Sequence, residues 1–180
     1  MRLRQLRAET GDRITLRWRA FPLRPVPDPT ATFAGTYREQ AWRRCQDLAR
    51  DTGVTFRMWT RPDYPTWSLP ALEAAKCVAL QGDAAFEALH LRLYAAFFTE
   101  GVNIGRAEEV TTVVRAVPEV DIERFLADYE AGKGRQAVMD DYEAAVQEHG
   151  VRAIPTVVLE DGRRIVGAVA LAEYRRVLGA

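Results

Sequence analysis

The 180-residue sequence contains very little cysteine and histidine. Cys45 and Cys77 are its only cysteines, too few for a disulfide-stapled scaffold, and neither belongs to a Cys-x-x-Cys motif. With two histidines in the whole chain, no Cys/His cluster has the spacing of zinc ligands, so we expect no metal site. Neither a Ser-His-Asp arrangement nor a glycine-rich phosphate loop is present, which leaves the common hydrolase and nucleotide-binding patterns unsupported.

The sequence also lacks an excess of either charge and lacks a long hydrophobic run. Lys+Arg and Asp+Glu both number 25, so the formal net charge is zero and no global field favours nucleic acid or an anionic membrane. No apolar stretch is long enough to cross a bilayer, and the first residues, MRLRQLRAETGD, contain no secretory h-region. We therefore expect a cytoplasmic protein that binds neither nucleic acid nor membranes.

The first third of the chain predicts few regular elements. Residues 1–10 are typical of the end of a helix that stops at Gly11. Residues 13–20 alternate apolar and polar side chains, a period of two that predicts an edge strand with one buried face. A proline-rich loop follows, and then a helix is predicted from Tyr37 to Thr52. The next stretch, residues 54–68, is irregular and rich in aromatics; Trp59 and Trp67 could line a groove or be buried.

The rest of the chain predicts a helical block and then a hairpin. Ser68 is the expected N-cap of a helix that runs to Gly82, and Asp83 that of the next helix. Three shorter amphipathic helices are expected near residues 106–117, 121–131 and 135–149. The β-branched segment PTVVLE, the turn dipeptide Asp161-Gly162 and the segment RRIVGA predict a hairpin, which a closing helix follows.

The motif GVRAIPT, residues 150–156, joins the helical block to the hairpin. Taken alone, Pro155 could be an ordinary first residue of a strand. The other interpretation is a cis Ile154–Pro155 bond, a sharp bend that presents the backbone of Ile154 to a passing extended chain.

Three stretches together resemble the DsbA-like thioredoxin family. They are ITLRWRAFPLRP, ALEAAKCVALQGDAAFEALHLRLYAAFFTEGVNIG and HGVRAIPTVVLEDGRRIVGA, which lie in the family's order along the chain. They resemble the second strand, the paired helices of an inserted helical domain, and the cis-proline loop with its closing hairpin. The similarity is to the cytoplasmic branch of DsbA/FrnE-type oxidoreductases, which also includes 2-hydroxychromene-2-carboxylate isomerases and kappa-class glutathione transferases.

This resemblance implies an α/β fold, a thioredoxin-like sheet with an inserted helical domain. The thioredoxin-like domain would comprise residues 1–63 and 150–180, and the helical domain residues 64–149. The implied activity is thiol–disulfide exchange with a protein or a low-molecular-weight thiol, without a cofactor. The implied substrate-binding residues are Ala153, Ile154, Pro155 and Thr156. Whether the chain forms a homodimer stays open.

The departures from the family pattern concern the reactive dithiol. Family members open with a strand and a Cys-x-x-Cys at the start of the first helix, whereas Met1 already falls inside that helix, so we expect the natural protein to begin upstream of Met1. Cys45 and Cys77 lie on apolar helix faces and are interpreted mainly as packing residues, with a structural or regulatory disulfide as the alternative. We assign no catalytic residue in this chain. A glutathione-dependent isomerase or transferase, and a non-catalytic remnant or binding protein, remain alternatives.

Overall fold

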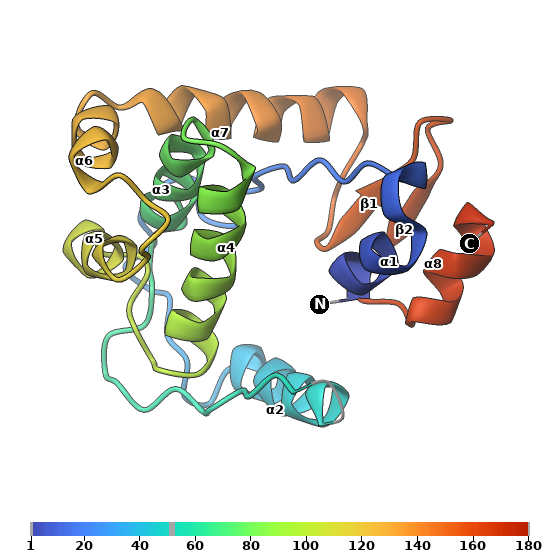
Figure 1. Ribbon diagram of the computed structural model, residues 1–180. Coiled ribbons are helices and arrows are strands. Elements are labelled where there is room, and N and C mark those ends of the chain that lie inside the picture. Colours follow the sequence, from blue (N-terminus) through green and yellow to red (C-terminus); the bar gives the residue numbers. More distant parts are fainter. Residues whose placement is uncertain (1, 51–52, 180) are drawn as a thin grey trace. The chain divides into compact units, whose positions relative to one another are not determined.

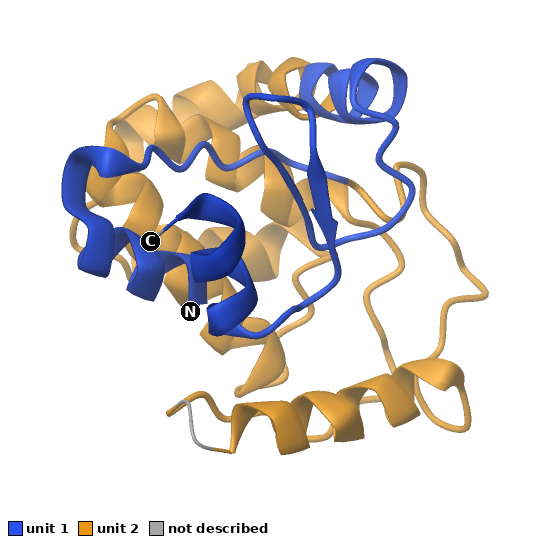
Figure 2. Cartoon of the chain, turned by 90° about the vertical axis from the view of Figure 1, so that its right-hand side faces the viewer, with its two compact units in different colours: residues 1–21, 140–180 blue, residues 22–139 orange. Residues whose placement is uncertain are grey.

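A computed structural model describes residues 2–50 and 53–179, and the contacts of the chain divide it into two compact units (Figure 2). The first unit contains residues 1–21 and 140–180, and the second contains residues 22–139. Residues 22–63, which the sequence analysis grouped with the thioredoxin-like part, thus belong to the second compact unit. No helix in the described ranges is long and apolar enough to span a membrane.

The first unit is built around the predicted hairpin, which is confirmed. Its elements are α1 (Arg2–Thr10), a 3-10 turn (Gly11–Arg13), β1 (Thr156–Val158), β2 (Arg164–Val166) and α8 (Leu171–Leu178) (Figure 1). The strands pair antiparallel, with Val157 opposite Ile165. The turn closes where the Gly162 N–H donates to the Leu159 carbonyl at 2.9 Å. Gly162 has a φ of +82°, a conformation that glycine adopts without the steric cost of a side chain.

One face of the hairpin carries the core of this unit. Leu6 of α1, Ile165 of β2 and Tyr174 of α8 are buried together, and Val157 of β1 packs against them. The two helices are also joined at their surface, where the Arg175 guanidinium donates to the Glu9 carboxylate at 2.7 Å. Because residues 157 and 165 point to the same side, residues 156, 158, 164 and 166 point to the other face.

Residues 13–20 do not form the predicted strand. Their burial alternates as expected, with Ile14, Leu16, Trp18 and Ala20 more buried than their neighbours. Ile14 is extended, with φ −129° and ψ 141°, but in the described residues the sheet contains only β1 and β2. A strand requires a ladder with a neighbour, and residues 13–20 have none there. The segment is held instead by Asp141, whose carboxylate accepts the backbone N–H of Ala20 at 2.7 Å and the guanidinium Nη1 of Arg19 at 2.8 Å.

The second unit is helical. Its elements are α2 (Tyr37–Ala49), α3 (Leu69–Ala79), α4 (Asp83–Phe98), α5 (Ala107–Arg115), α6 (Ile122–Glu130) and most of α7 (Lys133–Glu143), which a π-helical segment (Ala144–Glu148) continues (Figure 1). Buried side chains of α3, α4, α5 and α6 form its main core, in which Val78, Leu89, Val110 and Phe125 are fully buried. The end predicted for α2 at Thr52 lies outside the described residues.

Of the two predicted helix caps, Ser68 occupies the N-cap position of α3 as predicted, although its side chain does not cap the helix, and the prediction for Asp83 is wrong. The Ser68 hydroxyl makes no capping bond to α3; it accepts the Arg24 N–H at 2.9 Å instead and so ties the loop before α2 to the start of α3. Gly82, with φ +117°, is the N-cap of α4, and Asp83 is the first helical residue, where its charge suits the helix dipole.

The start of α7 packs unusually closely on α3. Gly134 has so little space that a Cβ atom there would lie 2.9 Å from both the Cα and the carbonyl carbon of Glu73. Next to it, Arg135 Nε donates to Glu73 Oε1 at 2.7 Å, which neutralises a carboxylate in a residue only 5% exposed. A glycine followed by an arginine thus allows the two helices to meet.

Candidate functional site

The four residues predicted to bind substrate form one exposed loop that leads into β1. The Ile154–Pro155 peptide bond is cis, and Ile154 is 43% exposed. Ala153 and Pro155 are also exposed, and Thr156 is half-buried. Among the described residues, the backbone N–H and C=O of Ile154 have no hydrogen-bond partner. Backbone polar groups need partners, so these two are free to bind water or an incoming chain.

The loop is fixed at its downstream end by two hydrogen bonds. Thr156 Oγ1 donates to the Ala153 carbonyl at 2.6 Å, which closes the bend on itself. The Pro155 carbonyl accepts the Gly167 N–H at 2.8 Å and so extends the ladder beyond β1 and β2. The carbonyl of Pro155 is therefore bonded to the hairpin, whereas the N–H and C=O groups of Ile154 make no hydrogen bond to it.

At its upstream end the loop is clamped by Arg164 of β2. Arg164 Nη1 donates to the carbonyls of His149 at 2.9 Å and Gly150 at 2.7 Å. Gly150 has a φ of +58°, which strains other residues, and a Cβ there would lie 2.9 Å from Arg164 Nη1, so a larger residue would push this guanidinium aside. Sequence reasoning missed Arg164 because nothing distinguishes it from the other arginines of the chain until the hairpin places it beside residue 150.

The cysteines lie away from one another in sequence and on different helices. Cys45 of α2 is half-buried and Cys77 of α3 is fully buried, and both thiols are free. Burial raises the pKa of Cys77 to about 11, and a backbone hydrogen bond from Gly134 offsets only part of this rise. The thiolate is the nucleophile in disulfide exchange, so Cys77 is unsuited to that role. Its interpretation as a packing residue is confirmed.

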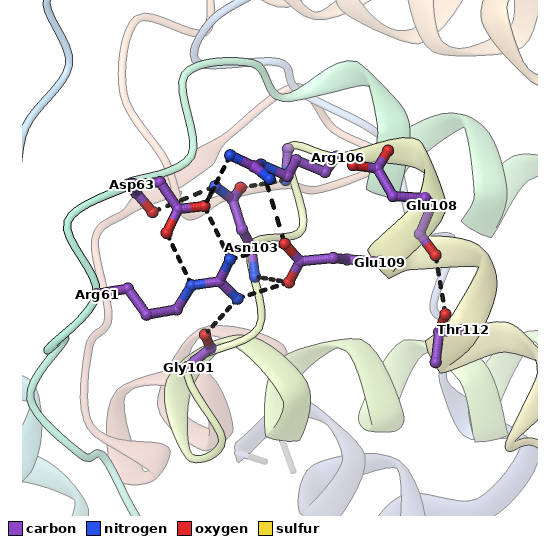
Figure 3. Close-up of polar contacts among 9 residues, drawn as sticks. Arg61, Asp63, Gly101, Asn103, Arg106, Glu108, Glu109 and Thr112 are labelled. Atoms are coloured by element: carbon purple, nitrogen blue, oxygen red, sulfur yellow. Dashed lines mark hydrogen bonds and ion pairs between the residues drawn. The ribbon is translucent and has the colours of Figure 1, made fainter.

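The second unit contains a polar cluster that the sequence did not predict (Figure 3). Arg61 donates to the carboxylates of Asp63 at 2.8 Å and Glu109 at 2.7 Å, and the Asn103 amide donates to Asp63 at 3.0 Å. The hydrogen bonds from Arg61, more than those from Asn103, lower the pKa of Asp63 to about 2. Arg106 lies 3.2 Å from the same carboxylate. Because the charged groups satisfy one another, the cluster fastens residues 61–63 to the start of α5 and offers no vacant binding group.

The two tryptophans of the irregular stretch, Trp59 and Trp67, differ in their burial. Trp59 is 7% exposed and packs with Phe33, Trp42 and their neighbours in an aromatic cluster of the second unit. Trp67 is half-buried, and its indole N–H donates to the Pro25 carbonyl at 3.2 Å. Of the two interpretations that the sequence left open, burial holds for Trp59.

Comparisons with known proteins agree with this fold. A family model described as "DSBA-like thioredoxin domain" matches residues 1–179. Among solved structures, one from Nitrosomonas europaea described as a "putative protein disulfide isomerase" superimposes with a TM-score of 0.75, covering 99% of this chain and 86% of that chain. The two sequences are 17% identical, so the likeness concerns the fold. No curated protein sequence matches the chain. The expected α/β thioredoxin-like fold with a helical insertion is confirmed.

Proposed function

Because this chain belongs to the DSBA-like thioredoxin domain family, we propose that it serves thiol–disulfide exchange by binding an extended polypeptide, or a small thiol, at residues 153–156. The observation that carries the proposal is the free backbone of Ile154 in an exposed loop that is fixed on both sides. An extended chain passing this loop can pair its own N–H and C=O groups with those of Ile154, as added strands do in peptide recognition.

In the exchange reaction a thiolate attacks one sulfur of a disulfide, a mixed disulfide forms, and the other sulfur leaves as a thiolate. The role we give to the loop is to hold the polypeptide around the reacting sulfur in an extended form. Cys45 and Cys77 stand on separate helices and form no Cys-x-x-Cys, so we assign neither of them the attacking thiolate.

This cysteine arrangement favours a second candidate, a family member that binds such polypeptides without reacting. The two candidates share the binding loop and differ in turnover. Insulin reduction with dithiothreitol separates them. Because these 180 residues contain no Cys-x-x-Cys, we expect no rate above that of dithiothreitol alone, which is the result that favours the second candidate. Turnover that is lost when Cys45 or Cys77 is changed to Ser would show that our interpretation of these cysteines is wrong.

Binding itself is tested by titrating the ¹⁵N-labelled protein with a short, uncharged, extended peptide. We expect the amide signals of Ala153, Ile154 and Thr156 to shift in a saturable way, while those of α8 stay in place. A matched variant, Ile154→Pro, removes the N–H of residue 154 and should weaken binding. Saturable shifts that avoid residues 153–156 would refute the proposed site.

A further inference from the structure

A hollow of about 540 Å³ opens beside the proposed binding loop, entirely within the first unit. Ala153 and Thr156 of the loop contribute to its wall, and residues of the hairpin turn and of β2 line it as well. Thr156, Arg164 and Val166 share the face of the hairpin that points away from Leu6 and Tyr174. A side chain of a polypeptide lying on the loop can therefore enter this hollow.

The charged side chains around the hollow are all positive. Arg152, Arg163 and Arg164 line it, and no Asp or Glu is found among the residues that do. Arg152 forms no hydrogen bond or ion pair within the described part of the chain. Three guanidinium groups around one opening form a site that attracts an anion.

Two of these arginines, Arg163 and Arg164, have partners within the chain. These partners leave the positive charge of both guanidinium groups largely available. Arg163 Nε lies 2.7 Å from Asp161, but both side chains are more than half exposed, and such surface pairs are weak. Arg164 donates to the carbonyls of His149 and Gly150, which fix its guanidinium and carry no formal charge. The hollow thus combines Arg164, whose guanidinium is held by two carbonyls, with Arg152 and Arg163.

We propose that this hollow binds an acidic side chain of the substrate polypeptide, next to the residues that pair with the loop. The inference rests on the proposed function and adds a substrate class to it, extended chains with Asp or Glu near the reacting cysteine. Planar guanidinium groups bind carboxylates through paired, charge-assisted hydrogen bonds. A polypeptide suits the site better than nucleic acid, because the positive charge is confined to one hollow and the chain as a whole is neutral.

The test uses fluorescein-labelled short peptides of alternating Ser and Val, in which one Asp is moved along the sequence. Matched peptides carry Asn or Lys at the same position, and fluorescence anisotropy gives the dissociation constants. At the best position we expect Asp to bind about five- to tenfold more tightly than Asn at low salt. This preference should disappear at about 1 M NaCl, where the Debye length is only about 3 Å.

Two variants assign the preference to the hollow. In the double variant Arg152→Gln/Arg163→Gln the preference for Asp over Asn should fall sharply, because Arg164 is the only guanidinium left in the hollow, while binding of the Asn peptide stays the same. Both residues are exposed, so we expect the fold to survive, and equal melting temperatures check this. The control Arg7→Gln removes an equally exposed arginine of the same unit and should leave the preference intact.

Each outcome bears on a separate statement. Equal binding of Asp and Asn peptides overturns the acidic selectivity and leaves the peptide-binding function standing. Binding of no peptide overturns both. If a single-stranded oligonucleotide displaces the Asp peptide at lower concentration than unlabelled Asp peptide does, the site is one for polyanions and the proposal is wrong.

Discussion

Replacing Gly134 with Ala should destabilise the second unit. In most helices the same replacement would stabilise the protein. Gly134 lies in the first turn of α7, and Ala is preferred over Gly in a helix by up to about 1 kcal/mol. Propensity alone therefore predicts a gain. The structure predicts the opposite sign, because the new methyl group would meet the backbone of Glu73 in α3.

The magnitude follows from what must move. The nearest atoms are the Cα and carbonyl carbon of Glu73, each 2.9 Å from the position of the added Cβ, and its carbonyl oxygen is nearer still. A backbone cannot turn aside as a flexible side chain can, so α7 must shift away from α3. Overpacking of this kind costs about 1–3 kcal/mol, which leaves a net loss of about 1–2 kcal/mol after the gain in propensity. The melting temperature should fall by roughly 5 °C.

Urea unfolding followed by tryptophan fluorescence measures this effect, because Trp42 and Trp59 are buried in the second unit. The buried thiol of Cys77 receives a hydrogen bond from the Gly134 backbone. The shift of α7 should therefore also expose this thiol, so that it reacts with 5,5′-dithiobis(2-nitrobenzoate) in the absence of urea. The control is Gly101→Ala. Gly101 has a φ of +71° and open space around it, so this change should destabilise the protein through backbone strain without exposing Cys77. A higher urea midpoint for Gly134→Ala would refute the reasoning.

Three further predictions concern the cysteines, the Asp63 ion pair and the Asp141 contact. In the native protein at pH 8, iodoacetamide should modify Cys45 and spare Cys77, since Cys77 is buried and its pKa is about 11; mass spectrometry of the peptides checks this, and equal labelling would contradict it. The pKa of Asp63 is lowered to about 2 in the folded state, so its stabilising effect is complete above about pH 4 and is lost as the pH falls toward 2. Asp63→Asn should accordingly reduce stability by about 1–2 kcal/mol at pH 7, as urea midpoints would show, and by much less at pH 2; an equal loss at both pH values would argue against the ion pair. Asp141→Ala should cost about 2–3 kcal/mol and speed hydrogen exchange at the Ala20 amide, since it removes the partner of that buried N–H; unchanged exchange would mean that Asp141 does not hold the segment.

The sequence predicted those elements whose signals are local. The hairpin follows from β-branched runs around Asp161-Gly162, and the helices follow from their apolar stripes and from glycines that end them. Residues 13–20 show the limit of such reasoning, because alternation reports which side chains are buried and not whether a partner strand is present. Ser68 occupies the predicted N-cap position of α3 without a capping bond for a similar reason, since its hydroxyl accepts the N–H of distant Arg24 instead.

The candidate site was predictable in its loop and not in its surroundings. The motif around Pro155 marks residues 153–156 without any knowledge of the rest of the chain. The clamp by Arg164 depends on the hairpin register, which brings a side chain fourteen positions away onto Gly150. With so many arginines in the sequence, only three-dimensional placement distinguishes the ones that line the hollow from those that cover solvent-facing surfaces.

The division of the chain into units also sets the order in which its parts can become stable during synthesis. The second unit is one continuous stretch, residues 22–139, so all of its helices except the far end of α7 can pack as soon as they emerge from the ribosome. Helix α1 is made earlier, yet its partner α8 comes much later, and Glu9 and Arg175 are 166 positions apart. At about 5–20 residues per second, α1 waits roughly 8–30 s for that contact. Over that interval the apolar residues Leu3 and Leu6 lack their native cover, which makes the nascent chain a candidate for holding chaperones.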